Sequence, residues 1–155
     1  IHWETTLPHP LPTITADSDR LAQAIGNLLS NAVKYTPNGG KIQILCQNGK
    51  DDLASQPPSS KTNDHSHLHF IITNSSKPLS LDDQKKIFLP FYRGRNTSRF
   101  PQGMGLGLTI ARDIILAHQG SLDIESNPEY GNRFIIRLPI WLTSEKINPS
   151  ENPTS

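Results

Sequence analysis

The sequence DSDRLAQAIGNLLSNAVKYTP, residues 17–37, decides much of the fold. Its polar start, residues 17–19, offers side chains that can cap a helix. Apolar residues then recur at helical spacing, at positions 21, 25, 28, 29, 32 and 33. The pattern stops before Pro37, which cannot continue a helix, and the turn-forming residues 38–40 follow. The stretch therefore predicts an amphipathic helix with one face against a core.

The same helix carries a polar stripe formed by Asn27, Asn31 and Lys34. Their spacing puts them on one side of the helix, which we expect to face away from the apolar side. Asparagine is a mediocre helix former, so two of them in the interior need a reason. The stripe is either a solvated face, the simpler interpretation for Lys34 alone, or a ligand set for a hard cation such as Mg²⁺. Spacing alone leaves both interpretations open.

The rest of the chain alternates between strand and helix patterns. After the first helix we expect strands around residues 42–46 and 68–72, a short helix over 80–88, a longer helix over 108–118, and strands around 122–124 and 134–138. Residues 1–15 predict one or two short edge strands interrupted by prolines. The sequence thus predicts an α+β fold, a two-layer α/β sandwich. Its mixed, mostly antiparallel sheet would be covered on one face by about three helices.

Composition limits the domain organisation and the class of partner. The 155 residues suit one domain, which we place at residues 1–142, followed by a tail at 143–155 that we expect to be disordered. A formal charge of +1 does not favour a nucleic acid or a membrane surface as partner. The single cysteine, Cys46, excludes an internal disulfide and is expected to be a buried hydrophobe. No apolar run approaches the ~20 residues that span a bilayer.

A glycine cluster, Gly103-Met104-Gly105-Leu106-Gly107, leads directly into the helix expected at Leu108. Glycines allow backbone N–H groups to approach a phosphate closely, and a helix start adds unpaired donors and the positive end of the dipole. A flexible hinge is the simpler alternative. The cluster is no P-loop, because no Gly-Lys-Ser/Thr follows, and no strand precedes it as in a dinucleotide-binding turn.

Together these motifs resemble the catalytic domain of bacterial sensor histidine kinases. Residues 17–37 resemble the N box of that family, residues 87–93 (IFLPFYR) its F box, and Gly103–Leu108 its second glycine box. The resemblance implies a Bergerat fold that binds ATP with Mg²⁺. It also implies transfer of the γ-phosphate to a histidine of a dimerization and phosphoacceptor domain, with a response regulator receiver domain as the next partner.

The resemblance also sets expectations for the isolated domain. We expect it to be monomeric and cytoplasmic, with any membrane anchor of the parent protein outside this segment. We expect no autophosphorylation from the domain alone, because the phosphoacceptor domain would lie elsewhere. The alternative function is a degenerate nucleotide-binding or regulatory interaction module with weak or no kinase activity.

Individual roles follow from the same resemblance. Asn31, with Asn27, would ligate Mg²⁺ and Lys34 would contact phosphate, so these residues would carry the catalysis. The other nucleotide contacts would come from Tyr35, Asn74, Arg93, Gly103, Gly105, Leu106, Gly107 and Leu108. Residues 94–102 would form a short lid over ATP. Related ATPases carry a glutamate at the position of Asn27 as general base, and an asparagine there fits transfer to histidine with water left unactivated.

One motif departs from the family pattern. Where the family has Asp-x-Gly-x-Gly, this chain has Asn74-Ser75-Ser76-Lys77-Pro78. The carbonyl of Asn74 can still accept a hydrogen bond from the adenine amino group, but without the charge of a carboxylate. Pro78 fixes φ where the loop should be permissive. We therefore predict weaker or altered nucleotide binding.

Two histidine features complete the sequence analysis. His65, His67 and His69 alternate along an expected strand, where a metal site is conceivable but a polar outer face is the simpler interpretation. His118 is expected to be a residue of a helix end, not a catalyst.

Overall fold

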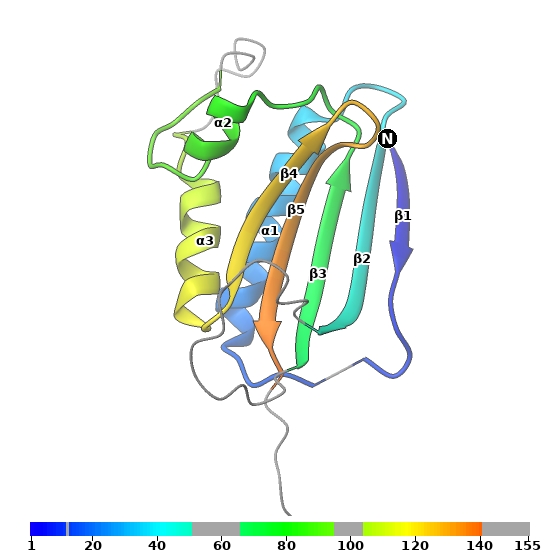
Figure 1. Ribbon diagram of the computed structural model, residues 1–155, viewed down its shortest axis with the longest axis vertical. Coiled ribbons are helices and arrows are strands. Elements are labelled where there is room, and N and C mark those ends of the chain that lie inside the picture. Colours follow the sequence, from blue (N-terminus) through cyan, green and yellow to red (C-terminus); the bar gives the residue numbers. More distant parts are fainter. Residues whose placement is uncertain (12, 51–65, 95–103, 141–155) are drawn as a thin grey trace, which may run out of the picture.

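A mixed five-stranded sheet forms one layer of the protein, and helices form the other (Figure 1). The computed structural model describes residues 1–11, 13–50, 66–94 and 104–140. Its elements are, in chain order, β1 (His2–Thr6), α1 (Ser18–Tyr35), β2 (Lys41–Lys50), β3 (Ser66–Asn74), α2 (Leu81–Lys86), α3 (Gly107–Ala117), β4 (Ser121–Asn127) and β5 (Gly131–Pro139). This confirms the predicted α+β sandwich. The predicted tail at 143–155 and the His65 position lie outside the described residues.

The sheet has the strand order β1-β2-β3-β5-β4. β1 pairs with β2 in parallel, and the other neighbours pair antiparallel. Parallel neighbours need a crossover, and α1 supplies it between β1 and β2. Residues 1–15 were expected to give one or two strands, and among those described only His2–Thr6 is a strand. All five of its residues are exposed at the edge of the sheet.

α1 begins and ends where the sequence predicts. The side chain of Asp17 accepts hydrogen bonds from the backbone N–H groups of Asp19 and Arg20, at 3.1 and 3.0 Å. The helix ends at Tyr35, and Thr36 adopts an extended conformation before Pro37. The buried residues of the helix are Leu21, Ala24, Leu28 and Ala32. Val33 was expected on this face but is 43% exposed, because it lies on the solvent side of the buried row.

α1 and α3 pack side by side and run in opposite directions across one face of the sheet (Figure 1). At one end, the backbone N–H of Asp17 donates to Nε2 of His118, at 3.1 Å. Nδ1 of His118 lies 2.7 Å from the carbonyl oxygen of Ile114, so the neutral ring with its proton on Nδ1 satisfies both partners. His118 thus joins the start of α1 to the end of α3, as a residue of a helix end.

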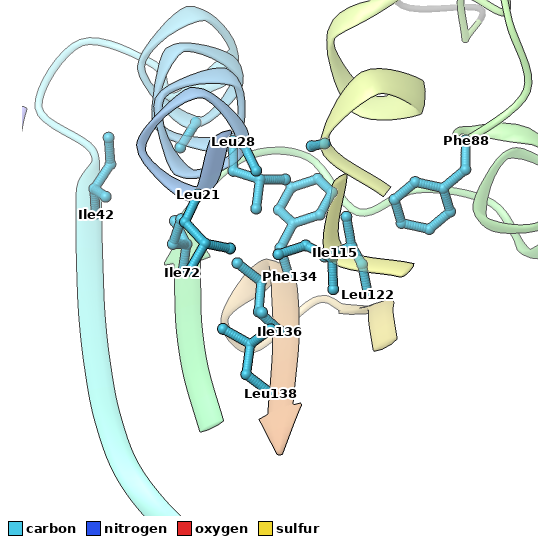
Figure 2. Close-up of a cluster of buried hydrophobic side chains, with 13 residues drawn as sticks. Leu21, Leu28, Ile42, Ile72, Phe88, Ile115, Leu122, Phe134, Ile136 and Leu138 are labelled. Atoms are coloured by element: carbon cyan, nitrogen blue, oxygen red, sulfur yellow. The ribbon is translucent and has the colours of Figure 1, made fainter. Parts of the chain in front are cut away.

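The core fills the space between this helix pair and the sheet (Figure 2). Leu28 of α1 and Ile115 of α3 are fully buried, and Phe134 of β5 is 1% exposed. Burying a side chain of this size stabilises a fold by about 1.5–3 kcal/mol. Cys46 is buried as expected, and burial raises the pKa of its thiol. Packing of this kind fixes the relative position of α1 and α3, on which the site below depends.

Within residues 1–11, 13–50, 66–94 and 104–140, every helix is too short or too polar to span a lipid bilayer.

Candidate functional site

The start of α3 is open. Its N-cap residue is Leu106, whose side chain has no hydrogen-bonding group, and its first turn contains no acidic residue. The first backbone hydrogen bond of the helix joins the N–H of Ile110 to the carbonyl oxygen of Leu106, at 2.9 Å. The N–H groups of Gly107, Leu108 and Thr109 precede that bond, so the helix itself gives them no acceptor. With the positive end of the helix dipole, these donors favour an anion.

Asn27 lies directly beside this open start. A Cβ placed on Gly107 would be 3.8 Å from Cγ and 4.0 Å from Oδ1 of Asn27. The structure therefore brings together two features that are 80 positions apart in the sequence. Because Gly107 has no side chain, the amide of Asn27 can lie close to the backbone of the helix start.

The sequence analysis expected the polar stripe of α1 to face away from the core. In the structure it does not. Asn27, Asn31 and Lys34 are all half-buried. At about 100° per residue, the stripe lies roughly a quarter of a turn from the row that contains Leu28. It borders the core instead of opposing it, and the start of α3 lies beside Asn27, the first residue of the stripe. The ligand interpretation of the two asparagines stays a prediction, and Asn27 lies against the start of α3.

Asn31 and Lys34 lie beyond the start of α3 along the axis of α1. The rise of 1.5 Å per residue puts them about 6 and 10 Å from the level of Asn27. Nζ of Lys34 lies 5.2 Å from the centre of the ring of Tyr35, within the range of a cation–π contact. The amide groups of the two asparagines and the ammonium group of Lys34 therefore form a polar row that leads away from the open helix start.

Gly105 has a structural requirement of its own. Its φ is +71°, and a Cβ there would lie 2.9 Å from the carbonyl oxygen of Tyr92. The N–H of Phe91 donates to the carbonyl oxygen of Gly105, at 3.1 Å. Only glycine fits this conformation and this approach without strain. The contact joins the segment after α2 to the segment before α3, and Gly103 lies outside the described residues.

A side-chain bond ties the same segment to α2. The hydroxyl of Tyr92 donates to Oδ1 of Asp83, at 2.6 Å, and the hydroxyl of Ser80 donates to the other oxygen of that carboxylate, at 2.7 Å. The next residue, Arg93, is exposed. The position of the F-box residues relative to α2 is therefore set by Asp83, which also pairs with Ser80 at the start of α2.

Asn74 occupies the end of β3, with Ile42 and Asn132 as its neighbours in the sheet. Its side chain is 1% exposed. Nδ2 donates to Oγ1 of Thr36, at 3.3 Å, whereas the buried Oδ1 has no hydrogen-bond partner within the described ranges. A buried acceptor without a donor costs about 1–3 kcal/mol. A ligand with an amino group would remove that cost, so this side chain fits the role expected for it.

The loop after Asn74 tolerates the loss of the two family glycines. Among the described residues other than glycine, only Phe91 and Gln119 have a positive φ, so Ser76 and Pro78 lie in conformations open to any residue. The backbone of this chain accommodates Pro78 with a negative φ, and the weaker or altered nucleotide binding stays a prediction.

Serine and asparagine side chains hold this loop against the end of the sheet. Asn132 donates to the hydroxyl of Ser76 and accepts from Ser126, which in turn accepts from the N–H of Leu79, at 2.8 Å. A Cβ on Gly131 would lie 2.7 Å from the carbonyl oxygen of Ser76. The loop and the β4–β5 turn thus meet backbone against backbone. Sequence reasoning missed this network, because its members are separated by about fifty positions.

Thr36 is a second residue that the sequence analysis missed. It is buried, and its hydroxyl donates to the carbonyl oxygen of Ala32, at 2.7 Å, while its Oγ1 accepts from Asn74. A signal existed, since a threonine at a helix end can bond the carbonyl four residues earlier. The partner on β3 could not be found from that signal.

Residues 16–142 match the family model described as the histidine kinase-, DNA gyrase B- and HSP90-like ATPases. The chain belongs to this family.

Comparisons with individual proteins narrow the family further. The chain is 34% identical over 137 residues to the adaptive-response sensory kinase SasA of a Synechococcus species, which covers 88% of this chain and 32% of that protein. It is 33% identical over 138 residues to SasA of Trichormus variabilis, with 89% of this chain and 31% of that protein covered. The chain thus spans about a third of the length of these curated relatives.

Solved structures of histidine kinases have the same fold as this chain. The mycobacterial sensor histidine kinase MprB superimposes with a TM-score of 0.70 at 25% identity, covering 89% of this chain and 82% of that one. The catalytic domain of histidine kinase ThkA, in a nucleotide-free form, gives 0.67 at 28% identity, covering 90% and 80%. Full-length ShkA in complex with AMPPNP gives 0.63 at 25%, covering 89% of this chain and 25% of that one. Within its family the chain is the ATP-binding catalytic domain of a sensor histidine kinase, and the degenerate module is not favoured.

Proposed function

We propose that this domain binds ATP with Mg²⁺ and donates the γ-phosphate to a histidine of a dimerization and phosphoacceptor domain. The longer protein would then pass the phosphoryl group to a response regulator receiver domain. The observation that carries the proposal is the meeting of Asn27 with the open start of α3 at Gly107. The structure of ShkA with AMPPNP supports it, because a relative with the same fold was solved with that ligand.

The phosphates would lie at the start of α3. The N–H groups of Gly107, Leu108 and Thr109 would donate to phosphate oxygens, and Lys34 would add a positive charge. Leu106, Gly103 and Gly105 would shape the approach, and Arg93 would reach the phosphates from the other side of the segment.

The metal would be held by the amide oxygens of Asn27 and Asn31, one turn apart on α1. Mg²⁺, when bound, supplies positive charge that neutralises the phosphates. Two neutral amides make a weak site by themselves, so we expect these residues to hold the ion only together with a nucleotide. The affinity for an ATP analogue should therefore fall when Mg²⁺ is removed with EDTA.

Asn27 also bears on the type of reaction. An amide accepts no proton at neutral pH, so Asn27 orients its neighbours without activating a water molecule. Transfer to a nucleophile that needs no such base, such as an imidazole, fits this arrangement better than hydrolysis. Catalysis would then rest on positioning and on the charges around the phosphates.

The base would lie at the far end of α1, between Tyr35 and Asn74. Thr36, which contacts Asn74, is nine residues from Asn27, and this places it about 14 Å along the helix axis from the start of α3. That separation is on the scale of an extended nucleoside triphosphate. The orphaned Oδ1 of Asn74 would accept a hydrogen bond from the amino group of adenine.

Two glycine variants test the phosphate position by calorimetric titration with a non-hydrolysable ATP analogue. Gly107→Ala adds a methyl group between Asn27 and the helix start, at an ordinary contact distance of 3.8 Å, so the fold should persist. We expect affinity to fall by about tenfold or more, because the methyl group fills the space assigned to phosphate, a loss of at least ~1.4 kcal/mol.

Gly26→Ala is the matched control. Gly26 is exposed on α1, next to Asn27 in sequence, and a Cβ there would meet nothing within 4 Å. The variant should bind like the wild type, while helix propensity raises stability by up to ~1 kcal/mol. Equal binding by all three proteins would contradict the phosphate position, and failure of the wild type to bind any nucleotide would contradict the proposed function.

Phosphotransfer needs its own assay. The domain is mixed with the dimerization domain of its parent protein, or of a SasA relative, and with ATP labelled on the γ-phosphate. We expect an acid-labile label on the added domain and none on this chain alone. Binding of nucleotide without any transfer would favour the degenerate module instead.

A further inference from the structure

The buried pair formed by Thr36 and Asn74 has a property that a threonine and a carboxylate would lack. An amide has two unlike ends, one that donates and one that accepts, whereas both oxygens of a carboxylate accept. The end of Asn74 that faces a ligand therefore decides which ligands fit. A carboxylate at the same position would present an acceptor whichever way it turned.

Thr36 determines how the amide is turned. Its hydroxyl has one proton, which it gives to the carbonyl oxygen of Ala32 at 2.7 Å, the usual length for a hydrogen bond of this type. Toward Asn74 the hydroxyl can then only accept. Nδ2 of Asn74 faces it at 3.3 Å, and Oδ1 is left on the other side of the amide. The opposite orientation would place two oxygen acceptors against each other.

Burial makes this orientation count. Asn74 is 1% exposed and Thr36 is 8% exposed, so water does not readily exchange for either partner. The hydroxyl of Ser76 and the backbone around Gly131 hold the neighbouring loop against the end of the sheet. Oδ1 is thus a fixed acceptor in a site where an unmatched group is costly.

We propose that Thr36 is a positioning residue that sets base specificity, by holding the amide of Asn74 so that its carbonyl oxygen meets the nucleotide. The site then accepts a purine with an amino group at the 6-position and rejects one with a carbonyl oxygen there. This inference rests on the proposed function, since it needs a nucleotide at Asn74. In this role Thr36 acts through Asn74 and does not itself have to contact the nucleotide.

The test compares the affinities for ATP and ITP, which differ at the 6-position of the base. Both are measured by calorimetry with Mg²⁺ for the wild type, Thr36→Val and Thr36→Ser. Valine keeps the shape but removes the hydroxyl, and serine keeps the hydroxyl. We expect the wild type and the serine variant to prefer ATP, and the preference to fall by about tenfold in the valine variant, whose Asn74 is free to turn.

A second background separates positioning from a general loss of structure. In Asn74→Asp, both ends of the side chain accept, so adding Thr36→Val should leave the ATP-to-ITP ratio unchanged. Thr36→Ala replaces the valine variant if valine does not fold, as judged by thermal unfolding. The inference is overturned if removing the hydroxyl leaves the ratio of the Asn74 protein as it was, or if the ratio changes equally in the aspartate background.

The outcomes also separate this inference from the proposed function. A wild type that binds ATP with a preference insensitive to Thr36 overturns the inference alone. A wild type that binds neither nucleotide overturns both.

Discussion

The two long helices begin in opposite ways. At the start of α1, the side chain of Asp17 closes the helix by accepting from two backbone N–H groups, and Asp19 adds a negative charge in the first turn. At the start of α3, the N-cap is Leu106, whose side chain offers nothing to accept a hydrogen bond. The comparison teaches that one helix start is closed by its own side chains, whereas the other leaves its first N–H groups without a side-chain acceptor.

Leaving the start open has a cost that the rest of α3 must offset. A side-chain cap contributes about 1 kcal/mol, and α3 forgoes it. Ala111 and Ile115 are fully buried, and the Phe91–Gly105 hydrogen bond holds the segment before the helix. Tertiary packing therefore supplies the stability that the helix start does not.

Closing the start of α3 should have the largest effect. Leu106→Asp places a carboxylate where phosphate is proposed to bind, and repulsion between like charges should lower ATP affinity by at least tenfold, about 1.4 kcal/mol. Titration calorimetry measures the change. Leu106→Asn is the control, with nearly the same shape and no charge, and its loss should be smaller. Equal losses in both variants would mean that the charge at this position does not matter.

Opening the start of α1 should affect stability and not binding. Asp17→Ala removes the acceptor for the N–H groups of Asp19 and Arg20 and should lower the free energy of unfolding by about 1 kcal/mol. Thermal unfolding should then shift down by about 2–4 °C for a domain of this size. Asp113→Ala, at an exposed position within α3, should change little. A large loss of nucleotide affinity in Asp17→Ala would contradict the claim that the start of α1 serves stability and not binding.

Removing the hydrogen bonds of His118, which join the start of α1 to the end of α3, should have the smallest effect. His118→Phe keeps a flat ring but removes the acceptor for the N–H of Asp17 and the donor to Ile114. Because Asp17 is exposed, water can replace part of the lost bonding, and we expect a loss of about 0.5–1 kcal/mol. Denaturant unfolding measures it. A loss of several kcal/mol would show that the α1–α3 junction depends on this ring more than on the core.

Local signals predicted most of the fold. The cap at Asp17, the stop before Pro37 and the alternation in β2 and β3 all act over a few residues, and the structure agrees with each. The end of α3 shows the limit, because Gln119 takes the positive φ of 59° and the neighbouring Gly120 does not. Gly120 is needed for space, since a Cβ there would meet Leu138 at 2.9 Å. That contact is tertiary and leaves no trace in local sequence.

The candidate site was predicted only in part, because some of its contacts also join distant parts of the chain. Spacing brought Asn27 and Asn31 onto one stripe, and the glycine cluster located the start of α3. The direction of the stripe was wrong, because the boundary of a buried face depends on which helix packs beside it. The bond from Asn74 to Thr36 joins a strand to a helix end 38 positions away. Sequence alone identified the first residue by family pattern and gave no reason to pair it with the second.

The contact of Gly131 with the loop at Ser76 has a practical consequence for protein engineering. Transplanting the Asp-x-Gly-x-Gly loop of a relative into this chain would replace the loop at Ser76. The segment at Gly131 and Asn132, which packs against that serine, would stay unchanged. A chimera that also exchanges the Ser126–Asn132 turn should fold better than one with the loop alone. The two segments pack directly against each other, although they are far apart in the sequence.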